Sequence, residues 1–216
     1  MDFQFPDDLN RASNLILIFT TLILCIRYNI SLSYPIKLFL NDVISNDFLK
    51  HIIFQNIMKD KTLPILGRGL RPEGAKNCGP FRDNFFNKRI ATKLAESYGF
   101  PSGHSQSAGF FMTFIFVHFN KNPIIFFTSL LYSLYIPYTR VKLGCHTIEQ
   151  TIFGYLFGIL TYYLFEYIDN KFIKSNELNC LTRRNSNENK VNNKNLENKL
   201  NTNIKILDKQ TYNELD

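Results

Sequence analysis

The sequence predicts an all-α membrane protein. Residues 1–170 are expected to form a multi-pass bundle of about four to six transmembrane helices, and residues 171–216 a disordered polar tail. Two observations predict this organisation. Four stretches of the chain lack Asp, Glu, Lys and Arg over nearly the length that a bilayer requires. The end of the chain is instead rich in Asn, Lys and Glu, and it has too little apolar surface to offset the entropy lost on folding.

The four uncharged stretches supply the predicted spans. They are Ala12–Ile26, Ser105–Asn120, Asn122–Thr139 and Gln150–Phe165. At a rise of about 1.5 Å per residue, each is slightly shorter than the ~30 Å hydrocarbon core, so flanking residues must complete it. Buried helices of a soluble protein are the alternative. The last three stretches follow one another closely, which favours helical hairpins in a membrane.

The N-terminal half contains the first span and a less regular region. Asp2, Asp7 and Asp8 precede the first apolar stretch, which is the wrong charge for a signal peptide, so we expect a retained span. Between Tyr28 and Leu66, charged residues interrupt the apolar ones. This pattern predicts one or two further helices that either span the membrane or lie at its interface.

Charge is unevenly distributed along the chain. The sequence has 25 basic and 18 acidic residues, and residues 59–98 alone contain 9 basic and 4 acidic ones. Several of these are arginines, which bind phosphate oxygens in two-point contacts. In the tail, Asn and Glu dilute the lysines, so we expect solvated chain and no nucleic-acid partner. The four cysteines include no Cys-x-x-Cys pair, which argues against a zinc site.

Three short blocks carry the candidate chemistry. They are Gly67-Arg68-Gly69-Leu70-Arg71-Pro72, Pro101-Ser102-Gly103-His104-Ser105, and Thr139-Arg140 followed by His146. Ser102 is placed to cap the helix that starts near Ser105, so the amides of Gly103 and His104 would favour an anion. One helix leaves this face and the next returns to it, which brings both histidines to the same side. The last helix then takes the tail to the opposite side, and its Gly154 and Gly158 predict close helix packing.

In this order, beside membrane-length helices, the blocks resemble the type 2 phosphatidic acid phosphatase superfamily, which also includes vanadium haloperoxidases. The resemblance covers roughly residues 50–165. It implies that His146 is a nucleophile that forms a phosphohistidine and that His104 is the general acid. Arg71 and Arg140, with Ser102 and Gly103, would stabilise the phosphate. No cofactor is implied, and two histidines without an acidic or thiolate cluster predict hydrolysis without a metal.

The sequence departs from the pattern of this superfamily at two functional positions. Pro64 occupies the place of a lysine seven residues before Arg71, and Lys61 or Arg68 are the candidate substitutes for it in phosphate binding. Gln150 replaces the aspartate that orients the nucleophile. Two roles are open to Gln150: it can accept the ring N–H of His146, or it can close a capping box with Thr147. Glu149 is another candidate source of the missing negative charge.

The departures also indicate a branch of the superfamily. The pattern His-Thr-x-x-Gln, and His-Ser-Gln after the Pro-Ser-x pair, resemble the dolichyl diphosphate phosphatases, although Gly103 differs from that branch. This implies a polyprenyl diphosphate or lipid phosphate substrate and a membrane of the endoplasmic reticulum. Cys78 and Cys145 flank the blocks, so a disulfide is open to them in an oxidising lumen. A catalytically inactive protein that binds phosphate lipids is the alternative, and His118 is expected to be structural.

Overall fold

The computed structural model describes residues 12–58, 61–75, 78 and 98–171. The chain divides into two compact units, Met1–Phe165 and Glu166–Asp216, and of the second unit only residues 166–171 are described. Apart from Lys171, the predicted tail lies outside the described residues. The account below concerns the first unit.

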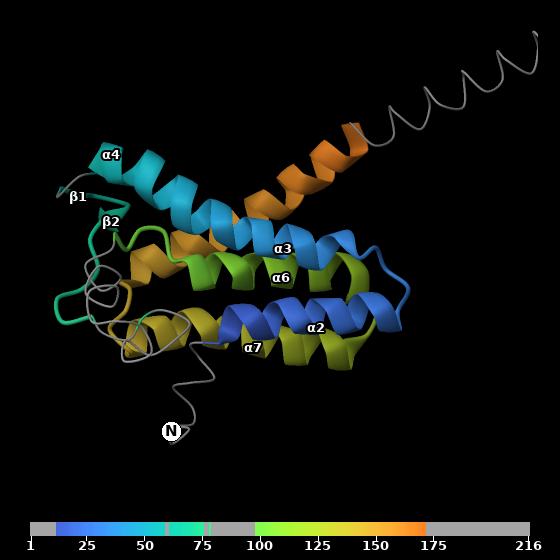
Figure 1. The fold of residues 1–216 in the computed structure, drawn as a ribbon. Coiled ribbons are helices and arrows are strands. Elements are labelled where there is room, and N and C mark those ends of the chain that lie inside the picture. Colours follow the sequence, from blue (N-terminus) through green and yellow to red (C-terminus); the bar gives the residue numbers. More distant parts are fainter. Residues whose placement is uncertain (1–11, 59–60, 76–77, 79–97, 172–216) are drawn as a thin grey trace, which may run out of the picture. The chain divides into compact units, whose positions relative to one another are not determined.

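Helices make up most of the described chain, as predicted (Figure 1). They are α2 (Ser13–Arg27), α3 (Ser33–Val43), the π-helix η1 (Ile44–Phe54), α4 (Gln55–Met58), α6 (Gly103–Phe119), α7 (Pro123–Lys142) and a final helix, Ile148–Lys171. Between Tyr28 and Leu66, where one or two further helices were expected, α3, η1 and α4 follow one another without a break. A short hairpin of β1 (Thr62–Leu63) and β2 (Gly67–Arg68) was not expected.

Helix α6 lies at the centre of the unit. It packs against α7, α3 and α2, and its side chains are buried nearly all round. Its second half, from Ala108 to Phe119, is largely apolar around the helix, as expected of an interior helix. The surrounding core is aromatic: the Tyr34, Phe110 and Tyr162 rings gather on α6. His118 lies in the same cluster, 3.4 Å from the Tyr162 hydroxyl, which agrees with a structural role.

Glycines bring the final helix into main-chain contact with α6. A Cβ atom on Gly154 would lie 2.4 Å from the oxygen of Ser102, and one on Gly158 would lie 2.0 Å from the oxygen of Gln106. Gly109 of α6 meets the oxygen of Tyr155 in the same way. The packing role predicted for Gly154 and Gly158 is therefore confirmed, and the contact holds the start of α6 against the final helix.

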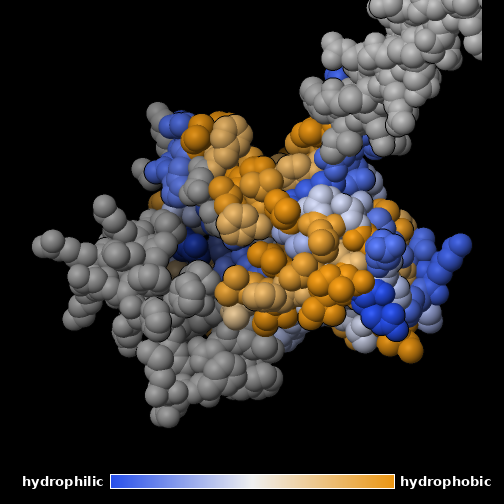
Figure 2. All heavy atoms as spheres, turned by 45° about the vertical axis from the view of Figure 1, so that its right-hand side comes forward, coloured by the Kyte–Doolittle hydropathy of each residue, from blue (hydrophilic) through white to orange (hydrophobic). Residues whose placement is uncertain are grey.

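The outward faces of the helices are apolar. On α7 the exposed residues Ile124, Phe127, Leu131, Leu134 and Tyr138 recur every three or four positions. Figure 2 shows apolar side chains over much of the visible face. Among the described residues, Pro123–Lys142 and Ile148–Lys171 are long and apolar enough to cross a membrane, and only 28% and 22% of their most apolar windows are buried. Core helices of a soluble protein would be mostly buried, so these helices indicate a membrane protein.

Candidate active site

The end of α7 turns the chain back so that His146 lies beside Arg140. Gly144 adopts a positive φ of 65°, which is accessible to glycine without strain. The amide of Gly144 then donates to Val141, and the amide of Cys145 donates to Arg140. These two bonds are those of a Schellman motif. The amide of His146 also donates to the Arg140 oxygen, at 3.2 Å, so the third sequence block closes on itself.

The first and second blocks lie side by side. The oxygen of Gly69 accepts hydrogen bonds from the amides of Gly99 and Phe100, at 2.9 and 3.0 Å. Leu70 and Tyr98 form an antiparallel bridge at the same place. Position 69 has room only for glycine, because a Cβ atom there would lie 1.9 Å from the hydroxyl of Tyr98. The segment before Pro101 is therefore fixed against the arginine-bearing loop.

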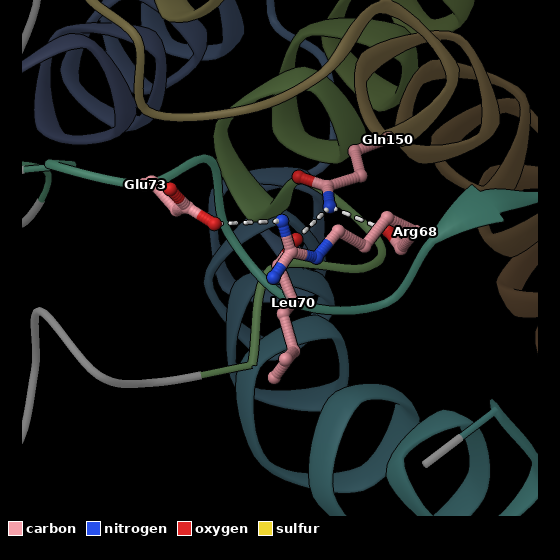
Figure 3. A network of polar contacts seen from close by, with 4 residues as sticks. All are labelled: Arg68, Leu70, Glu73 and Gln150. Atoms are coloured by element: carbon pink, nitrogen blue, oxygen red, sulfur yellow. Dashed lines mark hydrogen bonds and ion pairs between the residues drawn. The ribbon is translucent and has the colours of Figure 1, made fainter. Parts of the chain in front are cut away.

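Gln150 joins all of these segments (Figure 3). Its Nε2 atom donates to the main-chain oxygens of Arg68 and Leu70, each at 2.8 Å. Its Oε1 atom accepts from the amide of Thr147 at 3.3 Å and lies 3.0 Å from Nδ1 of His146. In return, the Thr147 hydroxyl accepts from the Gln150 amide at 3.3 Å. Gln150 thus makes both contacts that the sequence left open to it: it closes a capping box and it holds the histidine ring.

The same amide determines which nitrogen of His146 carries the proton. Because Nε2 of Gln150 donates to two carbonyl oxygens, the atom that faces His146 is an oxygen, which only accepts. Nδ1 of His146 therefore bears the hydrogen, and Nε2 bears a lone pair. This Nε2 atom lies 3.2 Å from Nη1 of Arg71, which donates to it. The lone pair of Nε2 therefore lies beside a guanidinium, a group that binds phosphate oxygens.

Burial and nearby positive charge keep His146 neutral. The side chain is only 2% exposed. Burial is the main cause that lowers its pKa well below the usual value, and the charges of Arg71, Lys50 and Arg140 lower it further, whereas the hydrogen bond to Gln150 raises it. Burial also lowers the pKa of Arg71 to about 10, so Arg71 stays charged at neutral pH. The site therefore pairs a neutral imidazole with cationic guanidiniums.

The second block contributes a helix start. Ser102 is the N-cap of α6, as predicted, and its hydroxyl accepts from the amide and the hydroxyl of Ser105. The amide of Ser102 donates to the main-chain oxygen of Gln150 at 3.0 Å. This bond joins the turn to the residue whose side chain contacts His146. Gly103 and His104 begin α6 here, and both are buried. Unpaired amides at a helix start favour an anion, so this turn can support a phosphate group.

Arg140 is completely buried at the end of α7. Its Nη2 atom donates to the main-chain oxygen of Cys78, and its positive charge lowers the pKa of His146. Cys78 and Cys145 form a disulfide, which sequence analysis had offered as one state of this pair. The bridge connects the segment after the first block to the residue that precedes His146.

Lys61 and Arg68, suggested in place of the missing lysine, and Glu149, suggested as a source of negative charge, all have exposed side chains. The Nη1 atom of Arg68 lies 3.8 Å from a carboxylate oxygen of Glu73 (Figure 3). Glu149 is exposed and lies against Gly67, so Gln150 rather than Glu149 contacts His146. The main-chain oxygen of Arg68, and not its guanidinium, is the part that reaches Gln150.

Sequence reasoning missed two residues that act on the site. Lys50 of η1 is only 5% exposed, and its charge acts on His146. It lies far from the motif in sequence, although an isolated lysine within an apolar helical region is a signal that could have found it. Gly99 is the second: a Cβ atom there would lie 2.8 Å from Oε1 of Gln150. Its need for a small residue depends on a contact that no local pattern encodes.

The charge of Lys50 gives a prediction about pH dependence. We expect Lys50→Met to raise the pKa of His146, because one of the charges that lower it is removed. Protonation of His146 would then begin at a higher pH, and the acidic limb of kcat/KM for a reaction that needs the neutral ring would shift to higher pH. The pH profile of the purified variant measures this. Lys142→Met, which removes an exposed positive charge at the end of α7, is the control and should leave the limb in place.

Within the described residues, no group of three or more His, Cys, Asp or Glu side chains is placed to hold a metal ion.

A solved structure, the first transmembrane PAP2 type phosphatidylglycerolphosphate phosphatase from Bacillus subtilis, is similar to this chain. The two share 18% sequence identity with a TM-score of 0.45, and the match covers 80% of each chain. The family model described as the PAP2 superfamily matches residues 47–174, which is more than half of the sequence and includes all three blocks. The chain therefore belongs to the PAP2 superfamily.

Proposed function

We propose that this protein is a multi-pass membrane phosphatase that hydrolyses a lipid phosphate or a polyprenyl diphosphate through a phosphohistidine, without a metal ion. Membership of the PAP2 superfamily supports a lipid phosphatase activity. One observation carries the mechanism. The hydrogen bonds of Gln150 place the proton of His146 on Nδ1 and leave the lone pair of Nε2 facing Arg71.

In the first step, Nε2 of His146 attacks phosphorus, and the bond to the leaving group breaks. The phosphoryl oxygens take the place of Nε2 as acceptors for Arg71, and Arg140 and the start of α6 add positive potential. Protonated His104 donates its proton to the departing lipid oxygen. Gln150 accepts the N–H of the phosphorylated ring, which keeps the ring oriented although an amide stabilises positive charge less than a carboxylate does.

In the second step, water replaces the histidine on phosphorus. Neutral His104 takes a proton from the water, whose oxygen forms a new bond to phosphorus while the bond to Nε2 breaks. Inorganic phosphate leaves, and both histidines return to their starting states. Each proton released in one step is consumed in the other, so the cycle needs no cofactor.

The substrate class follows from two features. The apolar outward faces of α7 and the final helix suit a protein that meets its substrate within a bilayer. The motif variants around His104 and Gln150 resemble the dolichyl diphosphate phosphatases, which favours a polyprenyl diphosphate and a location in the endoplasmic reticulum. We also propose that α2, α6 and the continuous run of α3, η1 and α4 cross the membrane with the two longer helices.

A substrate panel tests this proposal. The purified protein in detergent is mixed with phosphatidate, an isoprenoid monophosphate or a polyprenyl diphosphate, in the presence of a metal chelator. We expect phosphate release that the chelator does not reduce, fastest with the diphosphate, and inhibition by orthovanadate. Release from none of the three would favour the inactive phosphate-lipid-binding alternative, and activation by vanadate in a peroxide assay would indicate a haloperoxidase.

A further inference from the structure

The disulfide between Cys78 and Cys145 lies within the proposed phosphate site. The two residues are 67 positions apart in sequence, and their Cα atoms are separated by 5.5 Å. Both are buried, Cys145 completely. The described residues between Arg71 and Cys78 belong to no helix or strand. The bridge is therefore a covalent link between this irregular segment and the turn that follows α7.

Each cysteine also holds an arginine through its main-chain oxygen. Nη1 of Arg71 donates to the oxygen of Cys145 at 3.1 Å, and Nη2 of Arg140 donates to the oxygen of Cys78. The contacts cross, because each arginine binds the cysteine that belongs to the other arginine's segment. The disulfide joins the two residues that accept these bonds. His146 directly follows Cys145, so the nucleophile depends on the same turn.

We propose that Cys78 and Cys145 are positioning residues: their disulfide holds the two carbonyl groups that direct Arg71 and Arg140 at the phosphate. This inference rests on the proposed function. A charge-assisted hydrogen bond fixes a guanidinium only as well as its acceptor is fixed. With the bridge intact, both acceptors are tied to one covalent unit. When it is reduced, the turn still holds Cys145, but Cys78 loses its covalent attachment to that turn. Arg140 then loses a fixed acceptor, and Arg71 loses the covalent link that holds its segment against Cys145.

The inference also gives the protein a redox dependence. A dithiol reductant transfers two electrons and two protons to the bridge, giving two thiols and the oxidised reductant. The oxidised enzyme is the form that binds phosphate well. Disulfides persist in oxidising compartments, so the face of the membrane that carries the site would be the lumenal or external one.

The experiment measures phosphate affinity with the bridge present and absent. Inorganic phosphate is used as a competitive inhibitor of the purified full-length protein in detergent, before and after dithiothreitol. We expect reduction to raise the inhibition constant and KM about tenfold or more, the effect of weakening a charge-assisted contact. Cys78→Ser, Cys145→Ser and the double variant should all have the inhibition constant and KM of the reduced protein. Dithiothreitol should change neither value in these variants. Cys25→Ser, at a buried free cysteine on α2, should respond to dithiothreitol as the natural protein does.

Several outcomes would overturn the inference. If the serine variants unfold at lower temperature but keep the inhibition constant of phosphate, the disulfide only stabilises the fold. An unchanged constant in the reduced protein, with free thiols verified by mass spectrometry, contradicts it directly. Phosphate binding is also measured by calorimetry, which does not need turnover. If the oxidised protein binds phosphate more tightly than its reduced form but hydrolyses no lipid, the proposed function is rejected. The positioning role of the disulfide is then still supported.

Discussion

Replacement of His146 by alanine is expected to lower phosphate release from lipid substrates by at least about 10⁴-fold, the scale reported for loss of a catalytic nucleophile. The expected loss follows from the role proposed for Nε2, which would form the covalent bond to phosphorus. The two described side chains that contact the ring do not replace this lone pair: Arg71 donates to Nε2, and the Gln150 amide oxygen accepts from Nδ1. Stopped assays of inorganic phosphate with excess lipid substrate measure the loss.

The other histidines provide the comparison for this variant. His51→Ala removes an exposed histidine on η1 whose Nδ1 atom lies 3.0 Å from Oε1 of Gln55, so activity should be unchanged. His104→Ala should slow turnover but still allow phosphorylation of His146 when the leaving group needs no proton. Radiolabelled phosphate should then appear on the protein in an acid-labile, base-stable form, and His146→Ala should carry none. Radiolabel on the His146→Ala variant, or full activity of that variant, rules out His146 as the nucleophile.

Gln150→Glu is expected to lower activity and stability together, although the superfamily pattern has a carboxylate here. The substitution removes the two N–H groups that bind the oxygens of Arg68 and Leu70 and places an anionic oxygen against them. A buried acceptor left without a donor costs about 1–3 kcal/mol, and the contacts to Arg68 and Leu70 are partly buried. We therefore expect the free energy of unfolding to fall by about 1–3 kcal/mol in total, and the ring of His146 to lose its fixed orientation.

Thermal unfolding in detergent and kcat, measured on the same preparation, test this expectation. Glu149→Gln is the matched control, because it exchanges the same two groups one position earlier on an exposed side chain. It should leave both quantities close to those of the natural protein. A Gln150→Glu variant that is more active and equally stable would mean that the contacts to Arg68 and Leu70 do not hold the amide.

The sequence predicts the helices of this protein well, because their signals are local. Uncharged stretches of membrane length locate α2, α6, α7 and the final helix within a few residues, and Ser102 is recognisable as an N-cap from its neighbours alone. The small-residue spacing of Gly154 and Gly158 likewise identifies a packing surface. The motif order identifies His146, Arg71 and Gln150, which the structure brings into contact.

The remaining features depend on contacts between distant segments. Lys61 and Arg68 stay candidates for the place of the missing lysine because of their position in the sequence. The positive charge of Lys50 on η1, which lowers the pKa of His146, is apparent only from the fold. The motif could not decide between the two roles of Gln150, since only the positions of Arg68 and Leu70 show that one amide fulfils both. Cysteine spacing alone could not establish the bridge for the same reason.

The main-chain contact between α6 and the final helix constrains how a lipid reaches the site. Side chains between two packed helices can change rotamer and let the helices shift. At Gly109, Gly154 and Gly158 there is no side chain, and main chain packs directly on main chain. Parting these two helices would expose backbone on both and displace the turn at Ser102. The long-chain substrate of the proposed function would therefore reach the site without passing between these two helices.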